Sequence, residues 1–175
     1  MRASQIGSAV FEAEAKGQFA EELAELHDGS ISLFVTLPVF RSLLVSSESA
    51  ELLLRYESLL AEHLAHLDGI LGDVLVRRER SDGHLTRSLF RSITAARCQA
   101  ATLARDEQIL SIVEQAQLFL MGSCGFALRY ARLASGERSV QVLEESLARI
   151  GSIAVQLVAP HWNSRVHHEL SDAVA

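Results

Sequence analysis

The stretch SSESAELLLRYESLLAEHLAHLDGIL, residues 46–71, decides the fold class of this chain. Its large apolar residues recur every three or four positions, the spacing that places side chains on one face of an α-helix. The start Ser46-Ser47-Glu48 predicts an N-terminus, because serine oxygens accept free backbone N–H groups and an early glutamate favours the helix dipole. We therefore expect a helix from Glu48 to about Arg78. The expected buried stripe is Leu53, Tyr56, Leu60, Leu64, Leu67, Leu71 and Val74.

Upstream of this stretch, the same period predicts a helix from about Ala9 to Leu44. Pro38 should kink or split it, because proline lacks the N–H group that a helix interior needs. The expected apolar positions are Phe19, Leu23, Leu26, Ile31, Phe34 and Leu37.

Three more helices are expected downstream. A short helix should occupy residues 84–104. Asp106 is the candidate N-cap of a long helix that ends near Ala134. A last long helix should occupy residues 137–159, where Pro160 stops it.

Four long helices with a short one between the second and third predict an all-α four-helix bundle. A connection that holds an extra helix can cross the bundle end and make its flanking helices parallel, as in ferritin-like bundles. We expect one domain over residues 1–175, with a helical core at about 9–159 and a polar tail at 160–175.

The composition excludes intrinsic disorder, since 49% of the residues are hydrophobic. The net charge of -6 disfavours nucleic acid and anionic membranes as partners. Only Cys98 and Cys124 are available for disulfides, which favours a reducing compartment. The N-terminal residues lack a continuous apolar segment, so we expect no secretory signal and a cytoplasmic protein. A single lysine among 16 basic residues is typical of a GC-rich bacterial genome.

Three groups of short motifs support a family resemblance. They are ELHD at 25–28 with LP at 37–38; EL at 51–52 with YE at 56–57 and EHLAHL at 62–67; and RD at 105–106 with IL at 109–110, CG at 124–125 and VLEESL at 142–147. In order and spacing they resemble the bacterial YciE/YciF-type ferritin-like family of stress-associated proteins, over most of residues 20–155. The resemblance implies a ferritin-like bundle, usually dimeric, with a carboxylate-bridged dimetal site.

Position by position, most ligands that the resemblance implies are replaced in this chain. The glutamate of the first helix falls on Ser30, whereas the glutamate and histidine of the second fall on Glu62 and His66. The acidic segments of the other two long helices fall on residues 117–120 and 148–151, which hold no carboxylate. Two metal ions in a bundle core need several carboxylates to offset their desolvation. The resemblance therefore implies a bundle that has lost its dimetal site.

The leading hypothesis is a stress-associated bundle protein that needs no cofactor and acts as a homodimer or by binding another protein. Under this hypothesis, we expect the segment Leu118–Met121 to fill the bundle core in place of charged groups.

A second hypothesis is a metal-binding oxidoreductase or iron-handling protein. Glu62 and His66, four residues apart on one helix surface, are its candidate ligands, with His63 as a weaker third and His27 as a possible addition from the first helix. The metal would be iron, manganese or zinc. The alternative interpretation of this run is a half-buried polar shoulder on an apolar helix.

A third hypothesis is a carrier of an apolar small molecule, because Leu118, Leu120 and Ile150 stand where carboxylates are implied.

Two further features have competing interpretations. Glycine in a helix costs about 1 kcal/mol relative to alanine, so the run Gly122-Ser-Cys-Gly125 predicts a close helix approach, inside the bundle or across a dimer interface. A redox role for Cys124 is the alternative. A set of arginines surrounds the connection after the second helix, and without interleaved aromatic residues we favour a solvated or ion-paired surface over an anion site. It comprises Arg77, Arg78, Arg80, Arg87, Arg91 and Arg97.

Overall fold

The computed structural model describes residues 2–72, 83–134 and 136–153, with side chains from residue 11 onward. Its helices are α1 (Arg2–Leu43), α2 (Ser47–Leu71), α3 (His84–Arg97), α4 (Leu103–Ala134) and an unlabelled helix over residues 137–153. No strand occurs in these ranges, so the expected all-α class is confirmed. The expected ends at Arg78 and Pro160, and the apolar position Val74, lie outside the described residues.

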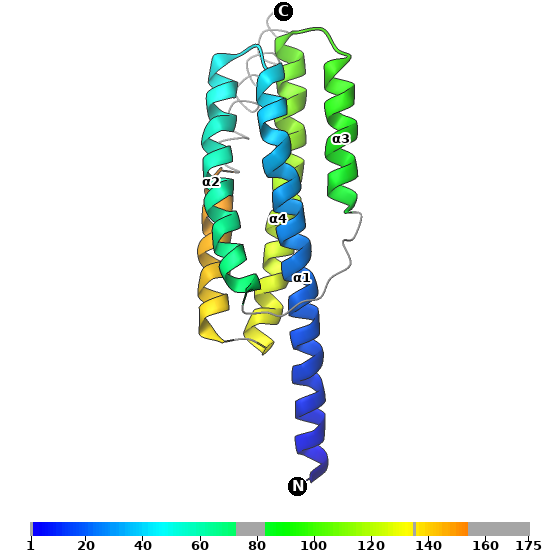
Figure 1. The fold of residues 1–175 in the computed structure, drawn as a ribbon, viewed down its shortest axis with the longest axis vertical. Coiled ribbons are helices and arrows are strands. Elements are labelled where there is room, and N and C mark those ends of the chain that lie inside the picture. The colour runs from blue at the N-terminus through cyan, green and yellow to red at the C-terminus, as the bar shows by residue number, and fades with distance from the viewer. Residues whose placement is uncertain (1, 73–82, 135, 154–175) are drawn as a thin grey trace, which may run out of the picture.

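The four long helices form a bundle, with α3 added along one side (Figure 1). The helix α2 runs antiparallel to α1, and helix 137–153 runs antiparallel to α4. The helices α2 and α4 run in the same direction, and α3 lies in the connection between them, as predicted. The short helix ends at Arg97 rather than near residue 104, because the Cys98 N–H turns back to the carbonyls of Ala95 and Ala96.

The structure differs from two expectations for α1, because the helix is not split at Pro38 and Ile31 is not buried. The helix passes through Pro38 without a break, since fully buried Leu37 and Phe40 anchor the chain on both sides of an exposed proline. Burying two such side chains contributes about 4 kcal/mol together, which is enough to offset the ~3 kcal/mol cost of an interior proline. Ile31 is exposed rather than buried, because the core face of α1 runs through Ser30 and Leu33.

The start of α2 is confirmed at the cap residue. Ser46 has extended backbone angles, and its Oγ accepts the N–H of Ser49 at 3.2 Å. The predicted stripe of α2 is buried at Leu53, Tyr56, Leu60 and Leu67, and half-buried at Leu64 and Leu71.

The turn between α1 and α2 is held by two buried residues of α4. The Asp106 carboxylate accepts the N–H groups of Val45 at 3.0 Å and Ser46 at 2.7 Å. The Arg105 guanidinium donates to the carbonyl of Leu43, the last residue of α1. The expectation that Asp106 is an N-cap is wrong, because α4 already begins at Leu103 and the carboxylate is used across the bundle.

We predict that Asp106→Ala lowers the free energy of unfolding by about 2 kcal/mol, because two backbone N–H groups of the turn lose their acceptor. Urea denaturation followed by circular dichroism measures this loss. Glu107→Ala, at an exposed neighbouring position, is the matched control and should leave the midpoint within about 0.5 kcal/mol of the parent. Equal midpoints for the two variants would contradict the assigned role of Asp106.

Candidate functional site

The centre of the bundle holds one buried polar side chain from each long helix. These are Ser30 of α1, His63 of α2, Gln117 of α4 and Ser146 of helix 137–153. Each is at most 2% exposed, and none carries a carboxylate. We call these four residues the buried polar layer.

Contacts between the helices place these residues at nearly the same height. Arg149 donates to Glu62 at 3.1 Å, which aligns α2 with helix 137–153 beside His63. The side-chain N–H of Gln117 donates to the carbonyl of Ile150, which aligns α4 with the same turn. Ser146 precedes Ile150 by one helical turn, so it faces the same core.

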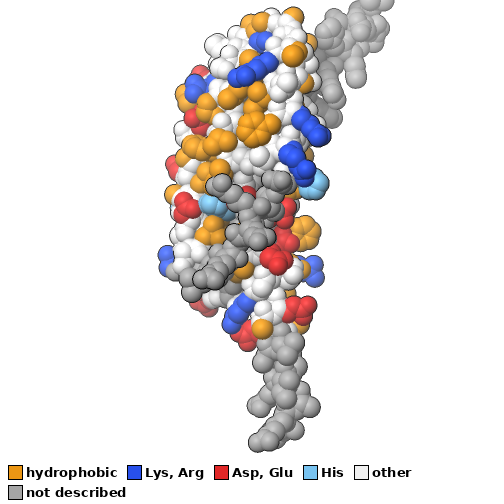
Figure 2. All heavy atoms as spheres, turned by 45° about the vertical axis from the view of Figure 1, so that its right-hand side comes forward, with side chains coloured by type: hydrophobic (Ala, Val, Ile, Leu, Met, Phe, Trp, Pro, Cys, Tyr) orange, Lys and Arg blue, Asp and Glu red, His pale blue; other side chains and the backbone are white. Residues whose placement is uncertain are grey.

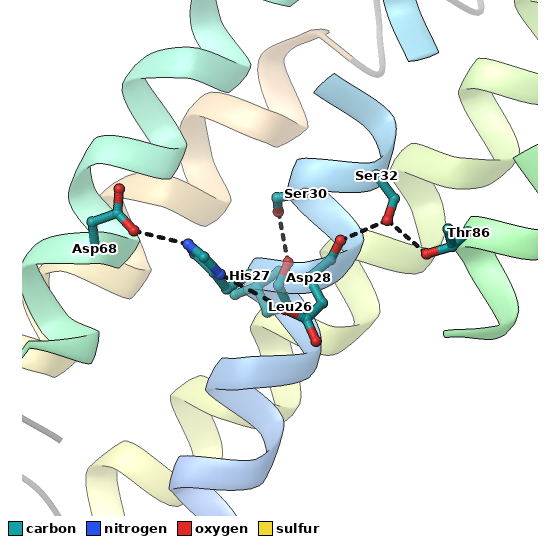
Figure 3. A network of polar contacts seen from close by, with 7 residues as sticks. All are labelled: Leu26, His27, Asp28, Ser30, Ser32, Asp68 and Thr86. Carbon is teal, nitrogen blue, oxygen red and sulfur yellow. Dashed lines mark hydrogen bonds and ion pairs between the residues drawn. The ribbon is translucent and has the colours of Figure 1, made fainter. Parts of the chain in front are cut away.

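Ser30 joins this layer through the packing of α1 on α4. A β-carbon at neighbouring Gly29 would lie 3.0 Å from Leu120 Cδ2, so Ser30 lies within one turn of Gln117. Its hydroxyl donates to the carbonyl of Leu26 at 2.7 Å, as Figure 3 shows. The sequence resemblance had aligned Ser30 and Gln117 with metal ligands, and in the described bundle both lie in the core.

Several polar atoms of the layer have no hydrogen-bond partner among the described residues. They are both ring nitrogens of His63, Oε1 of Gln117 and Oγ of Ser146. Buried polar atoms without partners are rare in folded proteins and cost ~1–3 kcal/mol each. The layer is therefore polar but weakly satisfied, and it offers donors and acceptors without net charge.

His63 is neutral at physiological pH. Burial, together with the nearby His66 and His27, lowers its pKa to about 4. His27 is held from α1 by Asp68 of α2, whose Oδ1 lies 2.8 Å from its Nε2 (Figure 3). A positive charge on His63 would have no described counter-ion in the layer.

The three predicted metal candidates lie in different surroundings. Glu62 is exposed and paired with Arg149, His66 is half-buried, and His63 is in the core. Neighbouring helical positions differ by about 100° in direction, which separates Glu62 from His63. The described ranges contain no group of three or more His, Cys, Asp or Glu side chains placed to hold a metal ion.

The expectation that Leu118 to Met121 fill the core is wrong for two of these residues. Leu118 is 55% exposed and Phe119 is 39% exposed, whereas Leu120 is fully buried. The helical period explains this, because Gln117, Leu120 and Cys124 share one face and residue 118 points away from it. An apolar segment alone did not reveal which of its side chains point inward.

A stripe on the outer side of α4 exposes large apolar side chains, and the exposed Arg129 lies on the same side between Phe126 and Leu133. The stripe consists of Leu118, Gly122, Phe126 and Leu133, and we call it the outer stripe of α4. A β-carbon added at Gly122 or Gly125 would meet no described atom within 4 Å. No described residue makes the predicted close approach to these glycines inside the bundle, and the alternative of a dimer interface stays a prediction.

Cys124 lies on the opposite, buried side of α4. Its thiol donates to the carbonyl of Leu143 at 3.6 Å, and burial raises its pKa to about 12. A thiol that stays protonated is a poor nucleophile, which argues against the redox interpretation. Cys98, after α3, is exposed.

We predict that Ellman's reagent titrates one thiol in the native protein and two after denaturation. The Cys98→Ser variant should show no fast reaction in the native state, whereas Cys124→Ser should react like the parent. Fast native reaction of the Cys98→Ser variant would show that Cys124 is accessible.

α4 is the one helix in the described ranges that is long and apolar enough to cross a membrane. Core helices of soluble proteins pass the same test, and α4 packs its apolar core face along α1. This property is weak evidence for a membrane location.

A surface hollow of about 360 Å³ lies at the turn between α4 and helix 137–153. Its lining includes Arg132 and Glu144, which form an ion pair at 2.7 Å. It is polar and open, and it is not continuous with the apolar positions Leu120 and Ile150, which are packed in the core. The hollow therefore does not supply the apolar cavity that the carrier hypothesis needs.

Comparison of the chain with protein-family models, curated proteins and solved structures finds no match to any of them.

We predict that the free energy of unfolding falls by about 3 kcal/mol between pH 6.5 and pH 4, in part because of His63. The folded state keeps His63 neutral down to about pH 4, whereas the unfolded state binds a proton below about pH 6.5. The contribution of His63 to the free energy of unfolding is therefore fully present above pH 6.5, and it is lost as the pH falls toward 4.

Urea denaturation at a series of pH values tests this linkage. His63→Leu should flatten the dependence in this window, and His84→Leu, at an exposed position, should retain the parental slope. Parallel pH profiles for His63→Leu and the parent would refute the assignment.

Proposed function

We propose that the protein is a ferritin-like bundle without a dimetal centre, and that it acts by associating with a second copy or with another protein. The observation that carries this proposal is the chemistry of the bundle centre, where the layer presents two serines, a glutamine and a neutral histidine. The resemblance places the protein among stress-associated bacterial proteins, and a cytoplasmic location belongs to the same proposal.

The cost of burying charge explains why the layer disfavours a dimetal site. Two divalent ions bring about four positive charges, and a core can hold them only with several carboxylates. The nearest acidic side chain that the resemblance aligns with a ligand is Glu62, which is exposed and bound to Arg149. Two members of the layer, Ser30 and Gln117, stand where the resemblance implies ligands, and neither carries a charge.

The helix order supports a ferritin-like arrangement. Two antiparallel hairpins, α1 with α2 and α4 with helix 137–153, are joined by a connection across the bundle that contains α3. This is how ferritin-like bundles join their two halves.

Association is supported by the apolar surface. The outer stripe of α4 contains Leu118 and Phe126, each 55% exposed, on either side of Gly122. Contiguous exposed apolar side chains of this kind mark interaction sites more often than free surface. Homodimerisation is the simplest association that covers the stripe.

A metal-binding oxidoreductase or iron-handling protein is the second candidate. It is favoured by one observation, the two unpartnered ring nitrogens of His63 next to the half-buried His66. Iron, manganese or zinc would then bind His63 and His66, and Glu62 would have to leave Arg149 to join them.

Metal analysis and sedimentation distinguish these proposals. After dialysis against a weak chelator, we expect less than about 0.1 equivalent of iron, manganese or zinc per chain, and a dimer in sedimentation velocity. Retention of about one equivalent that is lost in the His63→Leu, His66→Ala double variant would favour the metal protein. Retention that survives these substitutions would place the metal elsewhere and overturn both site assignments.

A further inference from the structure

The helix α3 covers only part of the side of α1 on which it packs. Near its start, Leu85 reaches Gly29, and Thr86 lies 2.6 Å from Ser32, as Figure 3 shows. From there α3 runs alongside the C-terminal half of α1, while the N-terminal half of α1 continues past the start of α3 (Figure 1).

The part of this side that α3 does not cover is acidic among the described residues. Glu25 and Glu22 precede Gly29 by four and seven residues, and Glu21 precedes Ser32 by eleven, so all three continue the face that binds α3. Partial burial raises the pKa of Glu22, and Glu25 and Glu21 raise it further. We call Glu21, Glu22 and Glu25 the acidic face of α1. In Figure 2, acidic side chains gather below the apolar and basic side chains of the upper part.

The helix α3 has the opposite charge. Its sequence, HLTRSLFRSITAAR, contains three arginines and no acidic residue, in a chain with a net charge of -6. Its outward side exposes Arg91 and the ring of Phe90, which is 56% exposed. The chain therefore carries a basic surface and an acidic surface on the same side, one above the other.

The outer stripe of α4 is symmetric about Gly122. Leu118 and Phe126 lie four residues before and after it, so an antiparallel two-fold contact at Gly122 would pack each Leu118 against the Phe126 of a second copy. In a two-fold contact, if Leu118 of one copy meets Phe126 of the other, then Phe126 of the first must also meet Leu118 of the second. The equal spacing on both sides of Gly122 satisfies this requirement. Glycine at the crossing allows the two helix backbones to approach closely.

From these surfaces we infer that two copies form an antiparallel two-fold dimer, in which the α4 helices cross at Gly122 and α3 of each copy docks on the acidic face of α1 in the other. This inference rests on the proposed function and specifies its interface.

The heights of the elements agree with this arrangement. Gly29 and Leu85 lie level with Leu120, half a turn from Gly122. A two-fold axis at Gly122, perpendicular to α4, leaves the α3 helices of both copies on the same side of the dimer. The same rotation makes the two α3 helices run in opposite directions. The second α3 then runs from that height along the N-terminal half of α1, where the acidic face lies. The interface thus pairs apolar with apolar and basic with acidic surfaces.

Sedimentation velocity of the full chain, with circular dichroism as a check on folding, tests the crossing point. Gly122→Arg should weaken the dimer about thirtyfold or more, because a long charged side chain enters the centre of the contact. Gly69→Arg is the matched control, since Gly69 is also exposed inside a helix with no described atom near its β-position. It should leave the dissociation constant unchanged.

Charge exchange tests the docking of α3. Arg91→Glu and Glu21→Arg should each weaken the homodimer about fivefold, and more at low salt. A mixture of the two variants should form a heterodimer more stable than either homodimer, because each α3 then faces an α1 of opposite charge. A contact within one chain would show no gain on mixing.

The outcomes distinguish self-association from this particular interface. The parent protein can be sedimented at concentrations up to about 100 times that used for the metal analysis. If it stays a monomer over this whole range, both self-association and this interface are overturned. A dimer that is insensitive to Gly122→Arg, or variants that gain nothing on mixing, would overturn the interface and leave self-association in place.

Discussion

The free-energy cost of burying charge is the constraint on which this structure depends. The centre of the bundle is polar at Ser30, His63, Gln117 and Ser146, yet each group is neutral. Without acidic side chains the core can be filled with leucines from all four long helices, and it needs no cation to balance it. The layer still leaves four hydrogen-bonding atoms without a partner among the described residues.

Charged groups that remain in the bundle are used at its end and on its surface. Arg105 and Asp106 are buried, but they bind backbone carbonyl and N–H groups of the turn between α1 and α2 and so fix one hairpin against α4. Glu62 pairs with Arg149 on the outside, which holds α2 against helix 137–153. Charged groups therefore bind at the bundle end and on its surface, while the interior holds apolar side chains and the neutral polar layer.

The helix α4 serves two surfaces at once. Its inner face holds Gln117, Leu120 and Cys124, and its outer stripe holds Leu118, Gly122 and Phe126. A helix with apolar side chains on two sides is typical of one that packs against neighbours on both sides. In this chain one side is covered by the bundle, and the proposed second copy would cover the other.

The sequence by itself determined the all-α class, the four long helices, the short helix before α4 and the Ser46 cap, because these follow from local periodicity and from one side chain near its own backbone. Only the tertiary structure decided that Leu118 points outward, that Pro38 is tolerated and that Asp106 binds the turn before α2. Each of these depends on which face of a helix meets a neighbour distant in the chain, and periodicity within one helix carries no information about that neighbour.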